Sequence, residues 1–398
     1  MDSTLTLLAR LLVGCIAIGF AQEAVSQRII IVDQYNPIGA HYSDIHPAIQ
    51  AAAVGDVILV RDGFFSGPII IDKGISVIAQ LPAGVWTDGP IVVQNVPAGQ
   101  TVVGRAWGGA SYGLGRNIGV VSCRGHVILE QCRGEKLVVL NSANVQLSRA
   151  DFYFFYLHSS NVILSGSRLG PIGPALNSRL PGGEVYSSRV TVADSTIWGD
   201  GGTFQQSGCF TIVPPTHAMF AKDSEIVVTG PKSEILGGRH GDGVYCPITN
   251  EQPGIWSGGN VQVIQDPASR ISRIYGGVTL TTRHTPVLSG KGAGAGSSAE
   301  ITLRTEKQTN FWLLASLPAY ANAAGFGFDL YLDWGTCVPI FAGQTDVLGA
   351  YTLQLPVPPT VPRGAGISWQ ALVGIKFPPA MRASTPVSLV MTTYNVGL

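Results

Sequence analysis

Charged residues are scarce in this chain of 398 residues: Asp, Glu, Lys and Arg together supply 13% of it, and the formal net charge is zero. Ordinary soluble proteins contain about 25%. Long surface helices need Lys and Glu on the face that meets water, so this composition argues against a helical protein. No run of Lys and Arg supplies the basic footprint of a nucleic-acid-binding protein, and nucleic acid is not an expected partner.

Long apolar stretches are absent as well. A bilayer span takes about 20 apolar residues, and no stretch of the chain reaches that length. The shorter run Leu11–Phe20 follows Arg10 and precedes the small residue Ala21, which is the pattern of a secretory signal peptide. Residues 1–21 are therefore expected to be removed and the mature protein to be secreted. The residues before and at Cys15 also match the bacterial lipobox, so a lipoprotein held at the cell surface through Cys15 is an alternative.

Metal-binding motifs are also missing. Among the six cysteines and seven histidines, no Cys-x-x-Cys or His-x-x-x-His pair suggests a zinc site. The acidic residues stand apart from one another, which argues against calcium with its roughly six to eight oxygen ligands, although stacking of coils can bring separated acidic residues together and leaves a calcium site open. We expect no metal and no other cofactor.

Export permits disulfides, and we hypothesise a bridge between Cys209 and Cys246.

Glycine is abundant, at 50 residues, and short apolar segments alternate with turns. Between His41 and Gln80 the pattern predicts a helix over Asp44–Ala53 with one apolar face. Three strands are then expected at Val57–Val60, Pro68–Ile71 and Ile75–Ile78. Strands separated by tight turns cannot form parallel units with crossover helices, since that connection takes about a dozen residues or more. They can wind as successive faces of a solenoid.

A four-residue unit recurs through the middle of the chain. It begins at His126, Asn144 and Asn161, at intervals of 18 and 17 residues, and related units begin at Arg189 and Asn260. The second and fourth positions of a strand point to the same side, and in these units both are apolar. A repeated unit that cannot bury its apolar face alone indicates a stacked solenoid. The second positions of the first three units, expected inside successive coils, are Val127, Val145 and Val162.

The segment Ile45–Ile75 carries Gln50-Ala51-Ala52 in its helix, Gly55-Asp56 at the break and Lys73-Gly74 at a turn. It resembles the cap helix and first coils of the pectin-lyase-like superfamily. The resemblance implies a right-handed parallel β-helix over residues 28–284, with the helix covering its open end. It does not imply a reaction, because the superfamily includes lyases, hydrolases, epimerases and non-enzymatic adhesins.

Residues 285–398 are expected to form a second, smaller domain. The Gly-rich stretch Gly290–Ser298 is either a linker or a loop inside that domain. Six short strand candidates follow it, separated by Pro- and Gly-rich turns, and this pattern predicts an antiparallel β-sandwich. Three segments resemble a C-terminal β module of secreted proteins from some environmental bacteria, a likeness that implies no role: Phe311–Ser316, Gly349–Pro358 and Ser368–Ala371.

Irregular spacing beyond residue 164 indicates three long loops in the solenoid. Inserted loops often build the binding face of such a protein, because they leave it from one side. We expect the loops at Gly170–Gly183, Gly199–Gly208 and Gly237–Gly258.

The third loop contains the best candidates for catalysis. His240 and Asp242 stand between glycines, and an imidazole beside a carboxylate can do general acid–base work. Pectin-lyase-like hydrolases carry a Gly-His-Gly motif and paired aspartates on adjacent coils, to which His240-Gly241, Asp242 and Asp200 are loosely similar. The family's strings Asn-Thr-Asp, Asp-Asp and Arg-Ile-Lys are absent. The alternative interpretation is a glycine-rich turn whose histidine and aspartate have purely local partners.

Aromatic residues in or beside the loops indicate a sugar-binding surface. Trp198, Tyr245 and Trp256 can stack on sugar faces while their polar edges stay in water, and Arg239 adds a cation beside them. The alternative is that these rings fill the cores of the loops.

Two functions compete on this sequence. We favour a secreted or cell-surface protein that binds extracellular polysaccharide or cell-envelope glycans without catalysis. The alternative is a carbohydrate-active enzyme, a hydrolase or a lyase, that uses Asp200, His240 and Asp242. The missing catalytic strings favour the binding protein, and a purely structural surface protein is a third interpretation. The sequence makes no prediction of oligomeric state.

Overall fold

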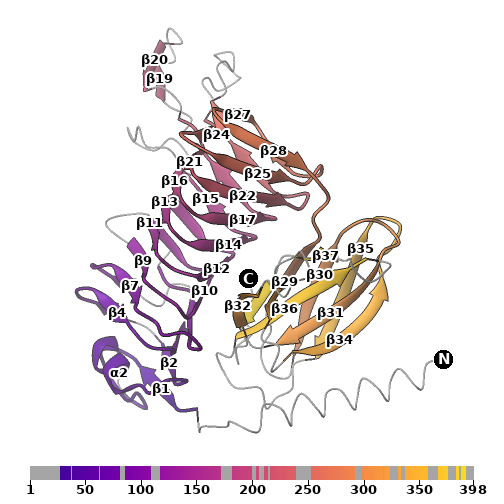
Figure 1. Ribbon diagram of the computed structural model, residues 1–398. Helices are drawn as coiled ribbons and strands as arrows, with labels where there is room; N and C mark the ends of the chain where they lie inside the picture. The colour runs from indigo at the N-terminus through magenta and orange to yellow at the C-terminus, as the bar shows by residue number, and fades with distance from the viewer. Residues whose placement is uncertain are drawn as a thin grey trace, which may run out of the picture. The chain divides into compact units, whose positions relative to one another are not determined.

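Strands dominate the computed structural model, and the described part of the chain contains a single α-helix, α2 (Ile45–Ala51) (Figure 1). The all-β class expected from the composition is therefore confirmed. The structure describes residues 27–36, 38–61, 63–80, 86–108, 117–171, 182–199, 203–205, 210–213, 216–238, 252–291, 297–316, 318–322, 330–332, 337–356, 366–374, 382–384 and 387–390.

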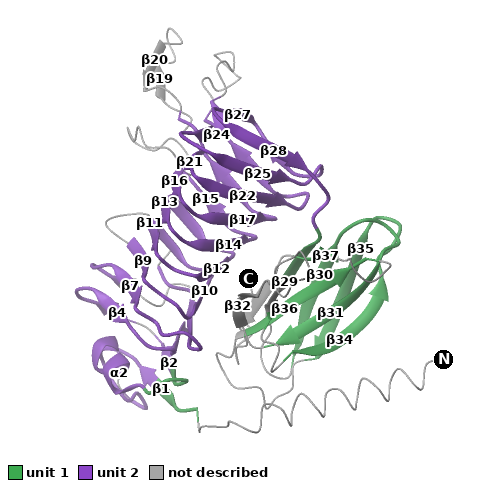
Figure 2. Cartoon of the chain, viewed as in Figure 1, with its two compact units in different colours: residues 1–30, 53–57, 286–398 green, residues 31–52, 58–285 purple. Residues whose placement is uncertain are grey.

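The chain divides into two compact units, which Figure 2 shows in different colours. One unit, the solenoid, contains residues 31–52 and 58–285. The other contains residues 286–398 and short segments near the start of the chain. Its part from residue 286 onward is called the C-terminal module below.

Two long parallel sheets build the solenoid, and the chain passes from one to the other in every coil. Each strand pairs with the equivalent strands of the coils before and after it, so the winding is that of a parallel β-helix, as expected. The first sheet contains β1 (Ile29–Val32), β2 (Val57–Val60), β5 (Ser76–Ala79), β8 (Thr101–Arg105), β10 (His126–Glu130), β12 (Asn144–Ser148), β14 (Asn161–Ser165), β17 (Arg189–Ala193), β22 (Ser224–Thr229), β25 (Val261–Gln265) and β28 (Val278–Thr282). The second sheet contains β4 (Ile69–Ile71), β7 (Ile91–Gln94), β9 (Asn117–Val121), β11 (Arg133–Leu140), β13 (Asp151–His158), β15 (Arg168–Leu169), β16 (Gly183–Tyr186), β18 (Thr196–Trp198), β21 (Met219–Lys222), β23 (Glu234–Leu236), β24 (Pro253–Ser257), β26 (Arg270–Ile271) and β27 (Arg273–Tyr275).

The repeat read from the sequence sets the register of the first sheet. Val127 pairs with Val145 and Val145 with Val162 in parallel neighbouring strands. All three side chains are at most 1% exposed. The expectation that they occupy equivalent interior positions on successive coils is confirmed.

A ladder of serines stabilises one corner of the solenoid. The amide of Ser142 donates to Oγ of Ser160, that of Ser160 to Ser188 and that of Ser188 to Ser224, at 3.1, 3.1 and 3.2 Å. The residue before each serine has a left-handed backbone, which costs a non-glycine residue about 1–2 kcal/mol. The ladder offsets that cost in each coil by satisfying buried backbone groups. These turn residues are Asn141, Ser159, Ser187 and Asp223, with φ of 48°, 48°, 45° and 51°.

The cap helix α2 is shorter than the expected Asp44–Ala53. It begins after Asp44, whose carboxylate accepts a hydrogen bond from the amide of His46 at 2.9 Å, as an N-cap residue does. Lys73 Nζ donates to the carbonyl of Ala52, just past the helix end, at 2.8 Å. The face of α2 that is buried consists of Ile45, Ala48 and Ile49.

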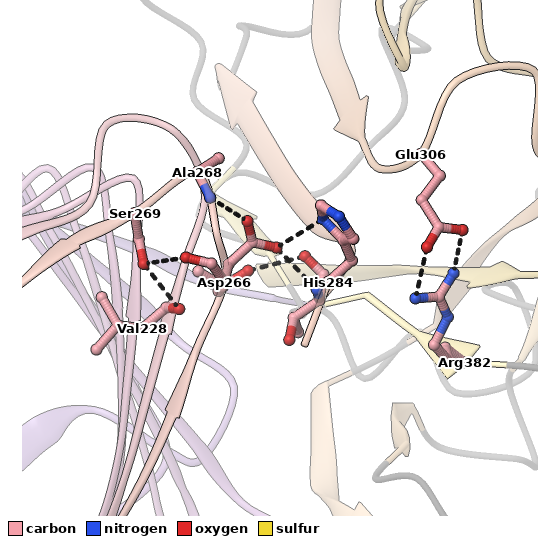
Figure 3. Close-up of polar contacts among 9 residues, drawn as sticks. Val228, Asp266, Ala268, Ser269, His284, Glu306 and Arg382 are labelled. Carbon is pink, nitrogen blue, oxygen red and sulfur yellow. Dashed lines mark hydrogen bonds and ion pairs between the residues drawn. The ribbon is translucent and has the colours of Figure 1, made fainter. Parts of the chain in front are cut away.

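Asp266 fixes the chain near the last coil (Figure 3). Its carboxylate accepts hydrogen bonds from the amides of Ala268 and Thr285, both at 2.8 Å, and lies 3.8 Å from Nδ1 of His284. The hydroxyl of Thr229 donates to the carbonyl of Thr285 at 2.8 Å.

None of the helices in the described residues has the length and apolar character needed to cross a membrane.

The C-terminal module is built from antiparallel sheets, as expected. Gly290 and Lys291 of the Gly-rich stretch belong to β29 (Val287–Lys291), and its last residue, Ser298, begins β30 (Ser298–Arg304). These two strands pair antiparallel, so the stretch falls inside the module and is not a linker to it. The first sheet of the module is β29 (Val287–Lys291), β30 (Ser298–Arg304) and β35 (Ala350–Pro356). The second is β34 (Val338–Gln344), β31 (Asn310–Ser316), β36 (Gly366–Val373), β37 (Arg382–Ala383) and β38 (Val387–Val390), and β32 (Pro318–Asn322) pairs with β33 (Leu330–Leu332).

Both of these sheets contribute to one apolar core, which makes the module a sandwich. Leu288, Ile301 and Leu303 come from one sheet, and Phe311 and Trp369 come from the other. An ion pair between Glu306 and Arg382, with a closest contact of 2.7 Å, adds a surface link within the module (Figure 3).

Candidate functional site

Three successive coils of the second sheet are interrupted at the same level. In the coil before them, β13 runs unbroken from Asp151 to His158 and pairs with both β15 and β16. In each of the next three coils the equivalent strand is split, into β15 and β16, β18 and β21, and β23 and β24. The chain between the two halves comprises residues 170–182, 199–218 and 237–252. Three long loops were expected here, and they leave the solenoid at one level. The second extends to residue 218 instead of 208, and the third ends at residue 252 instead of 258, because β24 begins at Pro253.

Each loop begins at a glycine, Gly170, Gly199 or Gly237, because the backbones approach very closely there, and the first loop also ends at one, Gly182. A Cβ on Gly170, at the start of the first loop, would lie 2.1 Å from the carbonyl oxygen of Trp198 in the next coil. A Cβ on Gly182, at the end of that loop, would lie at the same distance from the same oxygen. A side chain fits at neither position, so the coils can stack at the loop bases only with glycine there.

Most of the predicted site residues lie outside the described residues: Asp200, Arg239, His240, Asp242 and Tyr245, and also Cys209 and Cys246 of the hypothesised disulfide. The convergence of Asp200, His240 and Asp242 in one groove stays a prediction. Trp198 and Trp256 are described. Trp198 is half-buried at the end of β18, before the second loop, whereas Trp256 is 40% exposed in β24, after the third loop.

Trp256 belongs to a row of aromatic side chains that crosses five neighbouring strands, β13, β16, β21, β24 and β27. We call this set the aromatic row, and its members are Tyr156, Tyr186, Phe220, Trp256 and Tyr275. Consecutive ring centroids lie 5.7 Å apart for Tyr156 and Tyr186, 5.6 Å for Tyr186 and Phe220, and 5.3 Å for Trp256 and Tyr275. The ring of His217 closes the remaining gap, at 6.4 Å from Phe220 and 5.6 Å from Trp256.

The alternation of each strand turns these rings away from the interior. Leu157, Val185, Ala221 and Ile255, their neighbours along the chain, are fully buried, and successive strand residues point to opposite faces. Register keeps the outward positions aligned, because Phe220 pairs with Trp256 and Trp256 with Tyr275. Exposure rises along the row to 40% at Trp256 and 62% at Tyr275. The rings form one surface on the outer face of the second sheet.

Polar groups lie within this surface. Glu184 pairs with Tyr156 on one side and Phe220 on the other, and its Oε2 accepts a hydrogen bond from the Tyr186 hydroxyl at 3.2 Å. Burial raises the pKa of Tyr186, and the Glu184 carboxylate raises it further. Burial lowers the pKa of His217, and the charge of Glu184 opposes that effect. His217 is therefore neutral near pH 7, and its Nε2 is buried without a hydrogen-bond partner.

The row can bind a ligand through ring faces and can offer it a carboxylate, a phenol and a neutral imidazole. The described residues contain no group of three His, Cys, Asp or Glu side chains that could hold a metal ion.

Sequence reasoning missed most of this surface. It selected Trp256 but not Tyr156, Tyr186, Phe220 or Tyr275, and neither Glu184 nor His217 was a candidate. Tyr156, Tyr186, Phe220 and Trp256 each adjoin a buried small or aliphatic residue, which is a usable local signal. The loops nevertheless separate the members by irregular intervals, so their alignment does not show in the sequence.

No model of a known protein family matches the chain, and no curated protein matches it either. The fold and the site together define the class: a parallel β-helix protein with an exposed aromatic row beside three inserted loops.

Proposed function

We propose that this is a secreted protein whose solenoid binds extracellular polysaccharide or cell-envelope glycans without catalysis. The observation that carries the proposal is the aromatic row, in which rings from five neighbouring strands follow one another on an exposed face. Rings placed in this way can stack on sugars while their hydroxyl and indole groups stay in water.

Exposure distinguishes a binding row from a purely structural one. Each contact between rings of neighbouring coils stabilises the stacked coils by roughly 0.5–1.5 kcal/mol. Buried rings would give the same stabilisation. Tyr275, however, is 62% exposed and Trp256 is 40% exposed. A large apolar side chain that stays exposed adds little to the stability of the fold, because stabilisation grows with the area that is buried. A continuous exposed apolar surface is typical of an interaction site.

The pectin-lyase-like superfamily, with its right-handed coils, is the family we propose for the solenoid. Two parallel sheets and a capping helix at the N-terminal end support it. Secretion is proposed from the signal-peptide pattern of residues 1–21, with attachment through Cys15 as the alternative.

Trp256→Ala tests the proposal directly. We expect polysaccharide binding to weaken about two- to tenfold, the effect of losing one stacking ring, with a small change in melting temperature because 40% of the residue is already exposed. The measurement is affinity electrophoresis across a panel of polysaccharides, paired with a thermal melt.

Trp312→Ala is the matched control. Trp312 is 46% exposed on β31 of the C-terminal module, so its removal changes the same residue type at similar exposure outside the row. Unchanged binding in Trp312→Ala with weakened binding in Trp256→Ala supports the row. The reverse pattern would place the sugar site in the C-terminal module, and unfolding of Trp256→Ala would show that its ring is part of the core.

The alternative function, a carbohydrate-active enzyme, has one specific observation in its favour. Glu184, Tyr186 and His217 bring a carboxylate, a phenol and a neutral imidazole onto the same surface, and such groups can transfer protons. Asp200, His240 and Asp242 stay the residues predicted from the sequence for this function.

Glu184→Gln and His240→Ala separate the two functions. For a binding protein we expect each variant to keep most of its affinity, because neither removes a member of the aromatic row. For an enzyme we expect either variant to lower turnover by about a hundredfold or more, the size of a general acid–base contribution. The assay follows reducing ends and unsaturated products over many polysaccharides. Product formation by the unaltered protein that Glu184→Gln or His240→Ala abolishes would overturn the binding function.

A further inference from the structure

The aromatic row has a direction, and that direction limits the shape of its ligand. Its members come from strands that are hydrogen-bonded in the order β13, β16, β21, β24 and β27. Neighbouring strands are about 4.8 Å apart, so the row crosses the strands over roughly 19 Å. It runs along the solenoid axis, at right angles to the strands.

The described residues leave both ends of the row open. At one end Tyr275 lies on β27, the last strand of the path, and is 62% exposed. At the other end the same outward register continues from Tyr156 to Val138, Gly119, Val92 and Ile70. Val138 and Val92 are half-buried and Ile70 is 43% exposed, while Gly119 has no side chain to obstruct the track. A ligand can therefore extend past either end.

Tyr156, Phe220, Trp256 and Tyr275 share one register across the strands, and Tyr186 lies two residues further along β16, where Glu184 holds that register. Rings that follow one another along one axis in this way fit a straight polymer. A chain whose units follow one another in a ribbon can meet a ring in each coil, whereas a coiled chain leaves the line of rings after a few units. A terminal sugar would instead need a closed, concave site that surrounds it. We propose that the ligand of the aromatic row is an extended, ribbon-shaped β-linked glycan, bound along the solenoid axis through an internal segment of its chain. This inference rests on the proposed polysaccharide-binding function.

Oligosaccharide length and linkage test it. Cello-oligosaccharides, from the disaccharide to the octasaccharide, are titrated into the mature full-length protein by calorimetry. Malto-oligosaccharides of the same lengths are the matched control, because they contain the same sugar with an α-linkage that coils the chain. We expect affinity for the cello series to rise with length until the row is covered and then to level off. We expect the malto series to bind at least about tenfold more weakly at the longest length.

Truncation at the ends of the row supplies the second readout. Tyr275→Ala and Tyr156→Ala should each weaken binding of the longest cello-oligosaccharide about two- to tenfold, and in each variant the affinity should level off at a shorter oligosaccharide than in the unaltered protein. Tyr275 is the more exposed of the two, so Tyr275→Ala alone suffices if Tyr156→Ala does not fold.

Each failure has its own signature. Affinity that does not grow beyond the disaccharide, or equal binding of the cello and malto series, would overturn the ribbon-shaped ligand. Binding of another polysaccharide in the panel without any binding of cello-oligosaccharides would overturn it too, while the proposed function stands. Absence of binding to every polysaccharide would overturn both.

Discussion

Val145→Asp is expected to prevent folding, so that no soluble protein is recovered. Val145 is 1% exposed and lies between Val127 and Val162 in the stacked interior of the first sheet. Burying an unpaired carboxylate there costs several kcal/mol, and losing the buried valine removes about 1.5–3 kcal/mol more. A folded domain has only about 5–15 kcal/mol in total. The measurement is the soluble yield after expression, followed by a thermal melt of any protein recovered.

Val138→Asp is the matched control for that substitution. Val138 pairs with Tyr156 in the second sheet at an outward, half-buried position, so its carboxylate can reach water. We expect soluble protein that melts within a few degrees of the unaltered chain. A soluble Val145→Asp protein with a normal melt would contradict the interior register.

The fold was predictable because its determinants are local or strictly periodic. The units at His126, Asn144 and Asn161 recur at nearly one coil length, and that spacing alone places their second residues inside. The cap helix follows from a short apolar stripe after Asp44, although its end came two residues earlier than expected. The serine ladder was not predicted, because Ser142, Ser160, Ser188 and Ser224 interact only after the coils have stacked.

The site was less predictable because insertions break the period. From Tyr156 to Glu184 the interval is 28 residues, from there to Phe220 and on to Trp256 it is 36 each time, and Tyr275 follows after 19. These residues pair in register even so. The register of these strands is set by backbone pairing and by the glycines at the loop bases. The intervals between the aromatic residues in the sequence reveal neither. Trp256 was selected for its place beside a loop, and its partners in the row appear only in the fold.

Lowering the pH from 6.5 to 4 is expected to remove about 3 kcal/mol of stability through His126. This side chain begins β10, pairs with Thr101 and Asn144, and is 4% exposed. Burial lowers its pKa from 6.5 to about 4, and neither ring nitrogen has a hydrogen-bond partner. The fold therefore holds His126 neutral in a pH range where the unfolded chain takes up a proton.

The sign of the effect follows from that difference. Above pH 6.5 both states are neutral at His126 and its contribution is complete; as the pH falls toward 4, only the unfolded state is stabilised by protonation. Urea unfolding at about pH 7 and about pH 5 should show a loss of roughly 2 kcal/mol from this residue. His217, whose pKa burial also lowers, acts in the same direction, so the comparison is made with His126→Gln, which keeps His217. The variant should lose less stability than the unaltered protein between the two pH values, and equal losses would show that the fold does not keep His126 neutral.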